Sequence, residues 1–235
     1  MKILAPILLI LSALQAEAQF DKILQRAGIG QKSDDGKIAL GLKDALKVGT
    51  EHAVSRTGTL DGYFKNEAIK ILMPEKLRTI EKGLRLAGMG GQADAFILGM
   101  NRAAEEAAPK AKPIFWDALK AMTFDDARKI FTGGDTAATV YFKEKTSAGL
   151  AEEFRPVVSK SMAEVGVIKQ FEELTARAKQ LPFAKPETFD IEHYVLTKSL
   201  DGLFHVLGEE EKKIRTDPAA QVTSLLKEVF GGAKK

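Results

Sequence analysis

The chain contains no cysteine among its 235 residues. Thiol catalysis, thiolate metal sites and disulfide cross-links are therefore excluded, so the fold must be stabilised by packing. An excess of charge of one sign is also missing, because 35 basic residues face 32 acidic ones and both kinds are scattered along the sequence. A nucleic-acid-binding protein needs a one-sided basic patch. Nucleic acid is therefore not expected as a partner.

Long apolar runs are missing as well, except at the N-terminus. There Met1-Lys2 is followed by an apolar run from Ile3 to Leu14, and then by Ala16 and Ala18 in small-x-small spacing. This pattern predicts a secretory signal peptide over residues 1–18, cleaved after Ala18. The alternative is a membrane anchor, but a spanning helix needs roughly 20 apolar residues. We therefore expect a periplasmic or secreted protein without a transmembrane segment in the mature chain.

The mature region, residues 19–235, shows apolar residues at helical spacing in nearly every segment. No window alternates between apolar and polar residues as a half-buried strand would. A chain of this size buries roughly 70% of its unfolded surface, which is enough for one core. The sequence therefore predicts an all-α fold, an irregular or orthogonal multi-helix bundle in a single domain.

Glycine, proline and capping residues predict where the helices begin and end. We expect one helix over residues 34–54, a turn at Asp61-Gly62 and a second helical stretch over residues 64–71. Thr123 and Asp135 are expected to cap helices, because their side-chain oxygens can accept bonds from the first backbone N–H groups. A long helix should begin after Asp190 and be interrupted near Gly208, and a last helix should cover residues 218–230.

Two histidines near carboxylates raise the question of a metal site. Asp190, His193, Asp201 and His205 fall on one side of the long helix expected after Asp190, at spacings of three and four. Metal sites in helical bundles draw their ligands from several facing helices. Helix capping by Asp190 and surface positions for the histidines explain the pattern without a metal. We therefore expect neither a metal nor another cofactor.

Catalytic and phosphate-binding motifs are not evident. The sequence has no nucleophile elbow, and its paired acids lie at expected helix starts, where carboxylates are favoured. The glycine-rich segment from Gly133 to Thr136 could hold an anion at a helix N-terminus, although a tight turn between helices is the simpler interpretation.

Polar residues inside apolar segments are the remaining binding candidates. Asn101 and Arg102 follow Met100 in an apolar helix and need partners if they are buried. Those partners could be another helix or a ligand. The full set of binding candidates is Asn101, Arg102, Asp135, Thr139, Tyr141 and Asp201.

Several sequence blocks, taken in order, resemble the bacterial family known as domain of unknown function 4197. The resemblance covers essentially the whole mature chain and implies an exported, helical envelope protein of Gram-negative-type bacteria. It implies no activity and assigns no functional residue. The blocks are Gly62-Tyr63-Phe64-Lys65-Asn66, Ile69-Lys70-Ile71, Met100 to Glu105, Pro113-Ile114-Phe115, Asp126 to Ile130, Gly133 to Thr139, and Leu200-Asp201-Gly202-Leu203-Phe204 leading to Glu210-Glu211 and Ile214-Arg215.

These observations favour a non-enzymatic envelope protein that binds an apolar small molecule, a lipid or an envelope protein between its helices. We expect such a cavity among the inward faces around Phe96, Met100, Phe142, Leu203 and Phe204. The first alternative is a hydrolytic or metal-dependent enzyme that uses Asp201, His205 or Asp135. The second is a structural interaction module without a cavity.

Overall fold

The computed structural model describes residues 29–164, 166–178 and 189–217. The predicted signal peptide and the helix expected over residues 218–230 lie outside these ranges. Within them, all regular elements are helical and there is no strand. The prediction of an all-α fold is confirmed.

The helices differ greatly in length, and three of them are far longer than the others. In chain order they are α2 (Ile29–Thr57), the short 3-10 helix η1 (Glu75–Leu77), α3 (Arg78–Leu86), α4 (Gly90–Ala107), the 3-10 helix η2 (Ala108–Lys110), α5 (Ala111–Ala121), α6 (Phe124–Thr132), α7 (Ala137–Glu164), α8 (Val167–Ala178) and α9 (Ile191–Thr216).

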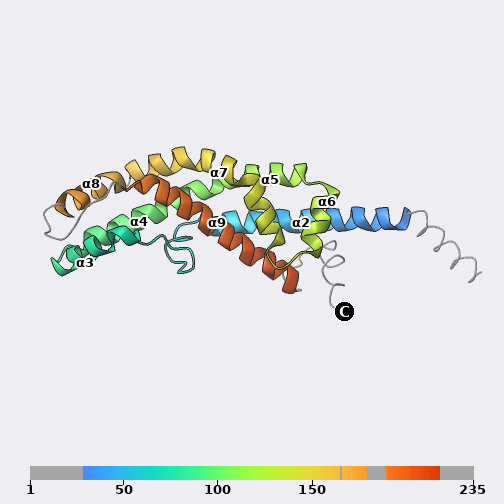
Figure 1. Cartoon of the computed structure of the whole chain (residues 1–235), viewed down its shortest axis with the longest axis horizontal. Coiled ribbons are helices and arrows are strands. Elements are labelled where there is room, and N and C mark those ends of the chain that lie inside the picture. The colour runs from blue at the N-terminus through green and yellow to red at the C-terminus, as the bar shows by residue number, and fades with distance from the viewer. Residues whose placement is uncertain (1–28, 165, 179–188, 218–235) are drawn as a thin grey trace, which may run out of the picture.

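The long helices give the molecule an elongated shape. Figure 1 shows α3 and α8 near one end and α5, α6 and the start of α2 toward the other, with α9 running between the two regions. Helix α9 packs against α7, α2 and α4, and α5 packs against α2 and α7. Helix α9 therefore joins the N-terminal helix to the middle of the chain.

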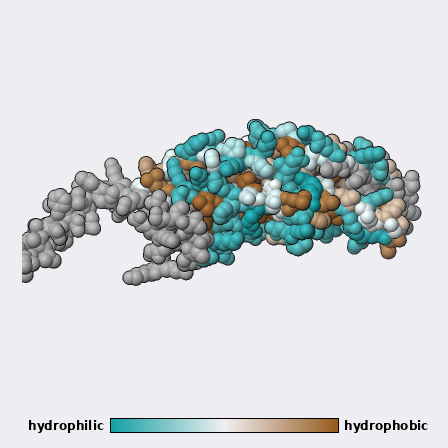
Figure 2. Space-filling view, turned by 180° about the vertical axis from the view of Figure 1, so that it is seen from behind, coloured by the Kyte–Doolittle hydropathy of each residue, from teal (hydrophilic) through white to brown (hydrophobic). Residues whose placement is uncertain are grey.

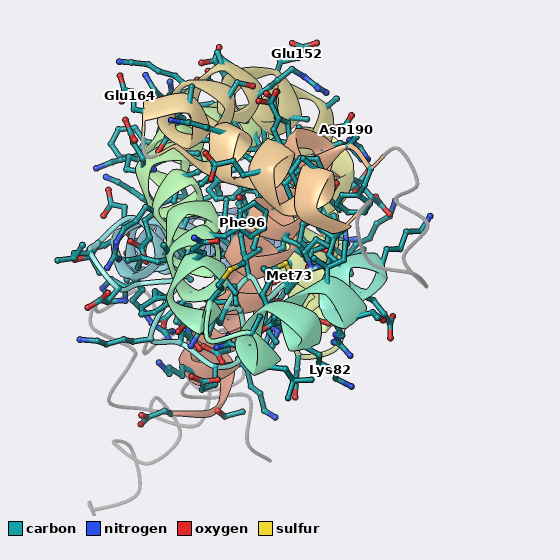
Figure 3. The ribbon with its side chains drawn as sticks, turned by 90° about the vertical axis from the view of Figure 1, so that its left-hand side faces the viewer. Met73, Lys82, Phe96, Glu152, Glu164 and Asp190 are labelled. Atoms are coloured by element: carbon teal, nitrogen blue, oxygen red, sulfur yellow. The ribbon has the colours of Figure 1, made fainter. Side chains whose placement is uncertain are left out.

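Buried apolar side chains from all these regions form one continuous core. Phe115 of α5 packs edge-on against Phe142 of α7, with ring centroids 5.2 Å apart, and against Phe204 of α9 at 6.2 Å. Figure 3 shows the opposite end, where Phe96 and Met73 lie in the interior and Lys82 lies on the outside. At both ends the helices meet through large side chains.

Two helix starts carry the caps that the sequence predicts. Thr123 and Asp126 form a reciprocal capping box at the start of α6, and Asp190 accepts a bond from the backbone N–H of His193 at the start of α9. The predicted interruption near Gly208 is wrong, because α9 continues through that residue. Leu203, Val206 and Leu207 are buried beside it, so packing offsets the roughly 1 kcal/mol that a glycine costs inside a helix.

The helical stretch expected over residues 64–71 is also wrong, because the chain runs through turns and irregular backbone there. The reason is that side chains of α4 bind the backbone groups that a helix would pair internally. Asn101 Oδ1 accepts a bond from Ile71 N–H at 2.8 Å, and Asn101 Nδ2 donates to Ile71 O at 2.8 Å. A tertiary contact overrides the local preference for helix.

No helix in the described part of the chain is long and apolar enough to span a bilayer. The face of the molecule in Figure 2 is mainly hydrophilic, with hydrophobic side chains in separate small patches. The described part of this face therefore offers no extended apolar surface for binding.

Candidate functional site

Asn101 and Arg102, two of the predicted binding residues, hold the irregular segment of residues 58–74 against α4. Asn101 is fully buried and bonded on both its oxygen and its nitrogen to the backbone of Ile71. Arg102 donates to Asp61 at 2.7 Å and to Glu105 at 2.6 Å. Both side chains have the first of the two kinds of partner considered for them, which are groups of the protein itself.

Glu105 and Tyr63 complete this bracing. Glu105 accepts bonds from the backbone N–H groups of Tyr63 and Phe64, each at 3.1 Å. The Tyr63 hydroxyl donates to the carbonyl oxygen of Ser199 in α9 at 2.5 Å. Complete burial raises the pKa of Tyr63, and the nearby charge of Glu105 raises it further. Tyr63 therefore stays protonated as a fixed donor.

Asp61 and Gly202 show how closely this segment fits. Asp61 has a φ of 67°, in the left-handed region that non-glycine residues seldom adopt. Bonds from Lys65 and Arg102 lower the pKa of its carboxyl group and hold it charged. A Cβ at Gly202 would lie 2.5 Å from the ring of Tyr63, so α9 can accept that ring only where it carries glycine.

Asp135, Thr139 and Tyr141 lie around the start of α7, apart from Asn101 and Arg102. The anion at this helix N-terminus is Glu211 of α9, which accepts bonds from the N–H groups of Ala138 and Thr139 and from the Thr139 hydroxyl, each at 2.8 Å. The capping role predicted for Asp135 therefore belongs to Glu211, and Asp135 is exposed. The protein's own carboxylate fills the anion site that was considered at Gly133 to Thr136.

Tyr141 is buried, and its hydroxyl contacts the carbonyl oxygen of Ala118 at 3.3 Å. Glu211 also accepts bonds from Arg215 at 2.9 and 3.0 Å, and Arg215 in turn donates to the carbonyl oxygen of Ile130 at 2.8 Å. This network ties α6, α7 and α9 together.

Asp201 and His205, the residues assigned to the rival enzyme, are exposed and lie on α9. Asp201 is 3.8 Å from Lys198, and His205 is 3.4 Å from Glu209. Within residues 29–164, 166–178 and 189–217, no three histidine, aspartate or glutamate side chains gather as a metal site would require. The candidate residues thus separate into groups with different local partners.

A first groove, of about 550 Å³, lies between α9 and the segment of residues 68–78. We call it the α9 groove. Its cations sit beside carboxylates: Lys70 is 3.6 Å from Glu67, Arg78 is 3.8 Å from Glu75, and Lys198 is 3.8 Å from Asp201. The Tyr194 hydroxyl, which also lines this groove, donates to the carbonyl oxygen of Leu72 at 3.1 Å.

A second groove, of about 630 Å³, lies between α2 and α5, and we call it the α2–α5 groove. Its apolar residues are Leu40, Trp116 and Leu119. Leu40 is 62% exposed, although it is a large apolar side chain. Charged residues complete the lining: Lys43, Asp44 and Lys47 from α2, and Lys120 from α5.

Helical spacing explains how these residues come together. Leu40, Lys43, Asp44 and Lys47 are three or four residues apart and so share one side of α2. This side differs from the one that carries Leu42, Ala45 and Leu46 into the core. The sequence predicts this helix from its core-facing apolar residues. Leu40 lies outside that pattern, so the pattern does not identify it as part of a groove. The chain's one tryptophan was the available signal for the α5 side.

Trp116 has the most unusual environment in this groove. Lys47 Nζ lies 5.2 Å and Lys112 Nζ lies 4.8 Å from the centre of its ring. The indole nitrogen has less than 1 Å² of accessible surface and no hydrogen-bond partner. It is the only buried side-chain donor or acceptor in the described part of the chain that lacks a partner.

The sequence predicts a cavity around Phe96, Met100, Phe142, Leu203 and Phe204. All five side chains are buried, and none of them lines either groove or the small pocket of about 10 Å³ between α2 and α9. Leu40 in the α2–α5 groove, by contrast, is a large apolar side chain that stays exposed.

Comparison with known proteins shows to which family the chain belongs. The sequence model described as "Protein of unknown function (DUF4197)" matches residues 32–231. The chain belongs to the DUF4197 family. No curated protein and no solved structure matches it. The braced segment, both grooves and all the helices from α3 to α9 lie within the matched region, so these features can be compared between DUF4197 proteins.

Proposed function

We propose that this DUF4197 protein is exported to the periplasm and there binds a single-tailed amphiphile, a molecule with one hydrocarbon chain and a polar head, in its α2–α5 groove. The observation that carries the proposal is the composition of that groove: an apolar floor of Leu40, Trp116 and Leu119 beside four charged residues. The signal-peptide pattern of residues 1–18 supports the export.

The size and chemistry of the groove suit such a ligand. Its volume of about 630 Å³ falls within the roughly 300–1,000 Å³ typical of small-molecule sites. Each methylene group of a tail that leaves water contributes about 0.8 kcal/mol. A bound tail would also cover Leu40, which is 62% exposed in the free protein.

Binding is a better account of this groove than catalysis. Among the residues that the structure describes, its titratable lining residues are three lysines and Asp44, and no serine or histidine lines it beside them. Nucleophilic catalysis needs a nucleophile and a base within hydrogen-bond reach of each other. The groove offers a surface for holding a molecule, without such a pair.

The test uses Trp116, whose fluorescence reports on the groove because it is the chain's only tryptophan. Protein recovered from the periplasm, with a mass that corresponds to a start at Gln19, is titrated with laurate and separately with dodecanol. We expect a saturable change in fluorescence. Leu40→Asn should weaken the binding of both ligands about tenfold, because burying a leucine contributes roughly 1.5–3 kcal/mol.

The matched control is Leu86→Asn on α3, since Leu86 is also exposed, at 90%, and lies far from α5 (Figure 1). It should bind like the unmodified protein. Both variants should keep their stability to within about 0.5 kcal/mol, as surface substitutions usually do. Failure to bind either ligand, or equal binding by Leu40→Asn, would favour the structural module without a ligand. Recovery of a chain that still begins at Met1 would contradict export.

A further inference from the structure

The lining of the α2–α5 groove carries more positive than negative charge. Lys43, Lys47 and Lys120 line it against one carboxylate, Asp44. Lys120 is 3.0 Å from Asp117, whereas neither Lys43 nor Lys47 lies within ion-pair distance of a carboxylate in the described part of the chain. The groove therefore keeps positive charge beside an apolar floor.

Lys112 adds a fourth ammonium group next to the groove. It lies over the ring of Trp116 and 3.6 Å from Glu51. A cation over an aromatic ring is held only weakly at an exposed site. Charge-assisted hydrogen bonds to a carboxylate are stronger. The ammonium groups of Lys47 and Lys112 can therefore leave the ring when a carboxylate arrives.

The buried indole nitrogen of Trp116 supplies the second, independent observation. A buried donor without a partner destabilises the protein. This donor belongs to Trp116, a residue that lines the groove and over whose ring the two ammonium groups sit. A ligand oxygen at this position would remove this destabilisation and meet positive charge at the same time.

We propose that the ligand of the α2–α5 groove is a fatty acid whose carboxylate accepts the Nε1–H bond of Trp116 and pairs with Lys43 and Lys47. This inference rests on the proposed function, because it names the head group of the molecule whose tail that function places on Leu40 and Leu119. Lys47 and Lys112 move off the ring as the carboxylate binds, which opens the path to the indole nitrogen.

The same charges discriminate between head groups. A neutral alcohol can accept the indole bond but gains nothing from the lysines. A phosphocholine head carries its own cation, which the lysines repel. The carboxylate therefore has one advantage over the alcohol, its pairing with the lysines, and repulsion of the choline cation weakens this advantage for the zwitterionic head.

The first measurement needs no variant. The indole N–H of the chain's one tryptophan gives a single resonance in a proton–nitrogen correlation spectrum of the isotope-labelled mature protein. Laurate should move this resonance downfield, as a new charge-assisted hydrogen bond does, and dodecanol should move it much less. Laurate should also bind about tenfold more tightly than dodecanol, since a hydrogen bond to a charged group contributes roughly 1.5–3 kcal/mol.

Variants then separate the head from the tail. Calorimetry replaces fluorescence as the readout, because Trp116→Phe keeps an aromatic ring but removes both the donor and the signal. Trp116→Phe and the double change Lys43→Gln with Lys47→Gln should each weaken laurate binding about tenfold, and the double change should leave dodecanol binding within about twofold. Lys82→Gln on the outside of α3 (Figure 3) makes the same kind of change away from the groove and is the control, which should alter the binding of neither ligand.

The outcomes distinguish this inference from the function on which it rests. If laurate and dodecanol bind equally and neither moves the indole resonance, the carboxylate assignment is wrong while tail binding stands. Tighter binding of dodecylphosphocholine than of laurate would also overturn it. If none of the three binds, the proposed function itself fails. The resonance on the unmodified protein decides the matter even if a variant does not fold.

Discussion

The two grooves of this protein are similar in size but opposite in character. In the α9 groove, Lys70, Arg78 and Lys198 each have a carboxylate nearby, and the Tyr194 hydroxyl is bonded to a backbone oxygen. In the α2–α5 groove, Leu40 is exposed, Lys43 and Lys47 have no acidic partner in the described part of the chain, and the Trp116 nitrogen is unpaired. The first groove has its interactions satisfied and the second does not.

This difference separates stability from binding. Buried polar groups that are fully paired specify a unique packing. The residues that first suggested a site, Asn101 and Arg102, brace the segment that forms one wall of the α9 groove. A buried polar group without a partner destabilises the free protein, and a ligand that supplies the partner removes this destabilisation. We therefore expect substitutions in the bracing networks to affect stability and substitutions in the α2–α5 groove to affect binding.

The largest effect should come from the bracing side, in Glu211→Ala. The change removes the anion from the N-terminus of α7 and removes the Glu211 carboxylate from Arg215, whose side chain is 11% exposed. Removing one partner of a buried ion pair costs roughly 3–5 kcal/mol. Urea unfolding of the mature protein should show a loss of this size. Exposed Glu152→Ala on α7 is the control and should lose at most about 0.5 kcal/mol. A comparable loss in both variants would remove the special role of Glu211.

A smaller loss of stability is expected at acidic pH, where Glu210 becomes protonated. Burial raises the pKa of Glu210, but bonds from Lys213 and Arg56 outweigh it, so its pKa lies below the usual value for a glutamate. A carboxyl group with a lowered pKa stabilises the folded state above its unfolded pKa, and this stability is lost as the pH falls through its folded pKa. The free energy of unfolding should therefore fall less steeply with acid in Glu210→Gln than in the unmodified protein. Urea titrations at a series of acidic pH values give the free energy of unfolding as a function of pH. Identical slopes for the two proteins would show that Glu210 is not the group responsible.

The smallest effect should come from Lys198→Gln, which changes the wall of the α9 groove. Lys198 is half exposed and has only a long ion pair of 3.8 Å with Asp201, and such surface pairs contribute about 0–1 kcal/mol. We expect stability within about 0.5 kcal/mol of the unmodified protein and unchanged laurate affinity. Weaker laurate binding in this variant would place the ligand in the α9 groove and reverse the comparison.

The sequence predicts the helical elements well where local signals decide. The capping residues Thr123 and Asp190 and the glycines after α3 set helix boundaries through interactions within a few residues. It fails where a distant residue decides. The segment around Ile71 is not helical because Asn101 binds its backbone, and Asp135 does not cap α7 because Glu211 does. Sequence spacing carries no information about these partners.

The candidate site is predictable only in part, for a related reason. A buried polar residue such as Asn101 is recognisable from its apolar neighbours, but whether it binds the chain or a ligand depends on the fold. Leu40 is a leucine in a helix full of apolar residues, and only the structure shows that it lies off the core side and stays exposed. Such an exposed apolar surface can be recognised only when the structure shows which side chains pack against it.

The position of Glu211 has a consequence for the order of assembly. It lies 73 residues after Ala138, and Glu210 bonds to Arg56 across 154 residues. Contacts between such distant parts of a chain form late and slow folding. The start of α7 and the C-terminal end of α2 therefore gain these partners only once α9 has been synthesised. A chain threaded through a membrane from its N-terminus would remain open until that last described helix arrives on the far side.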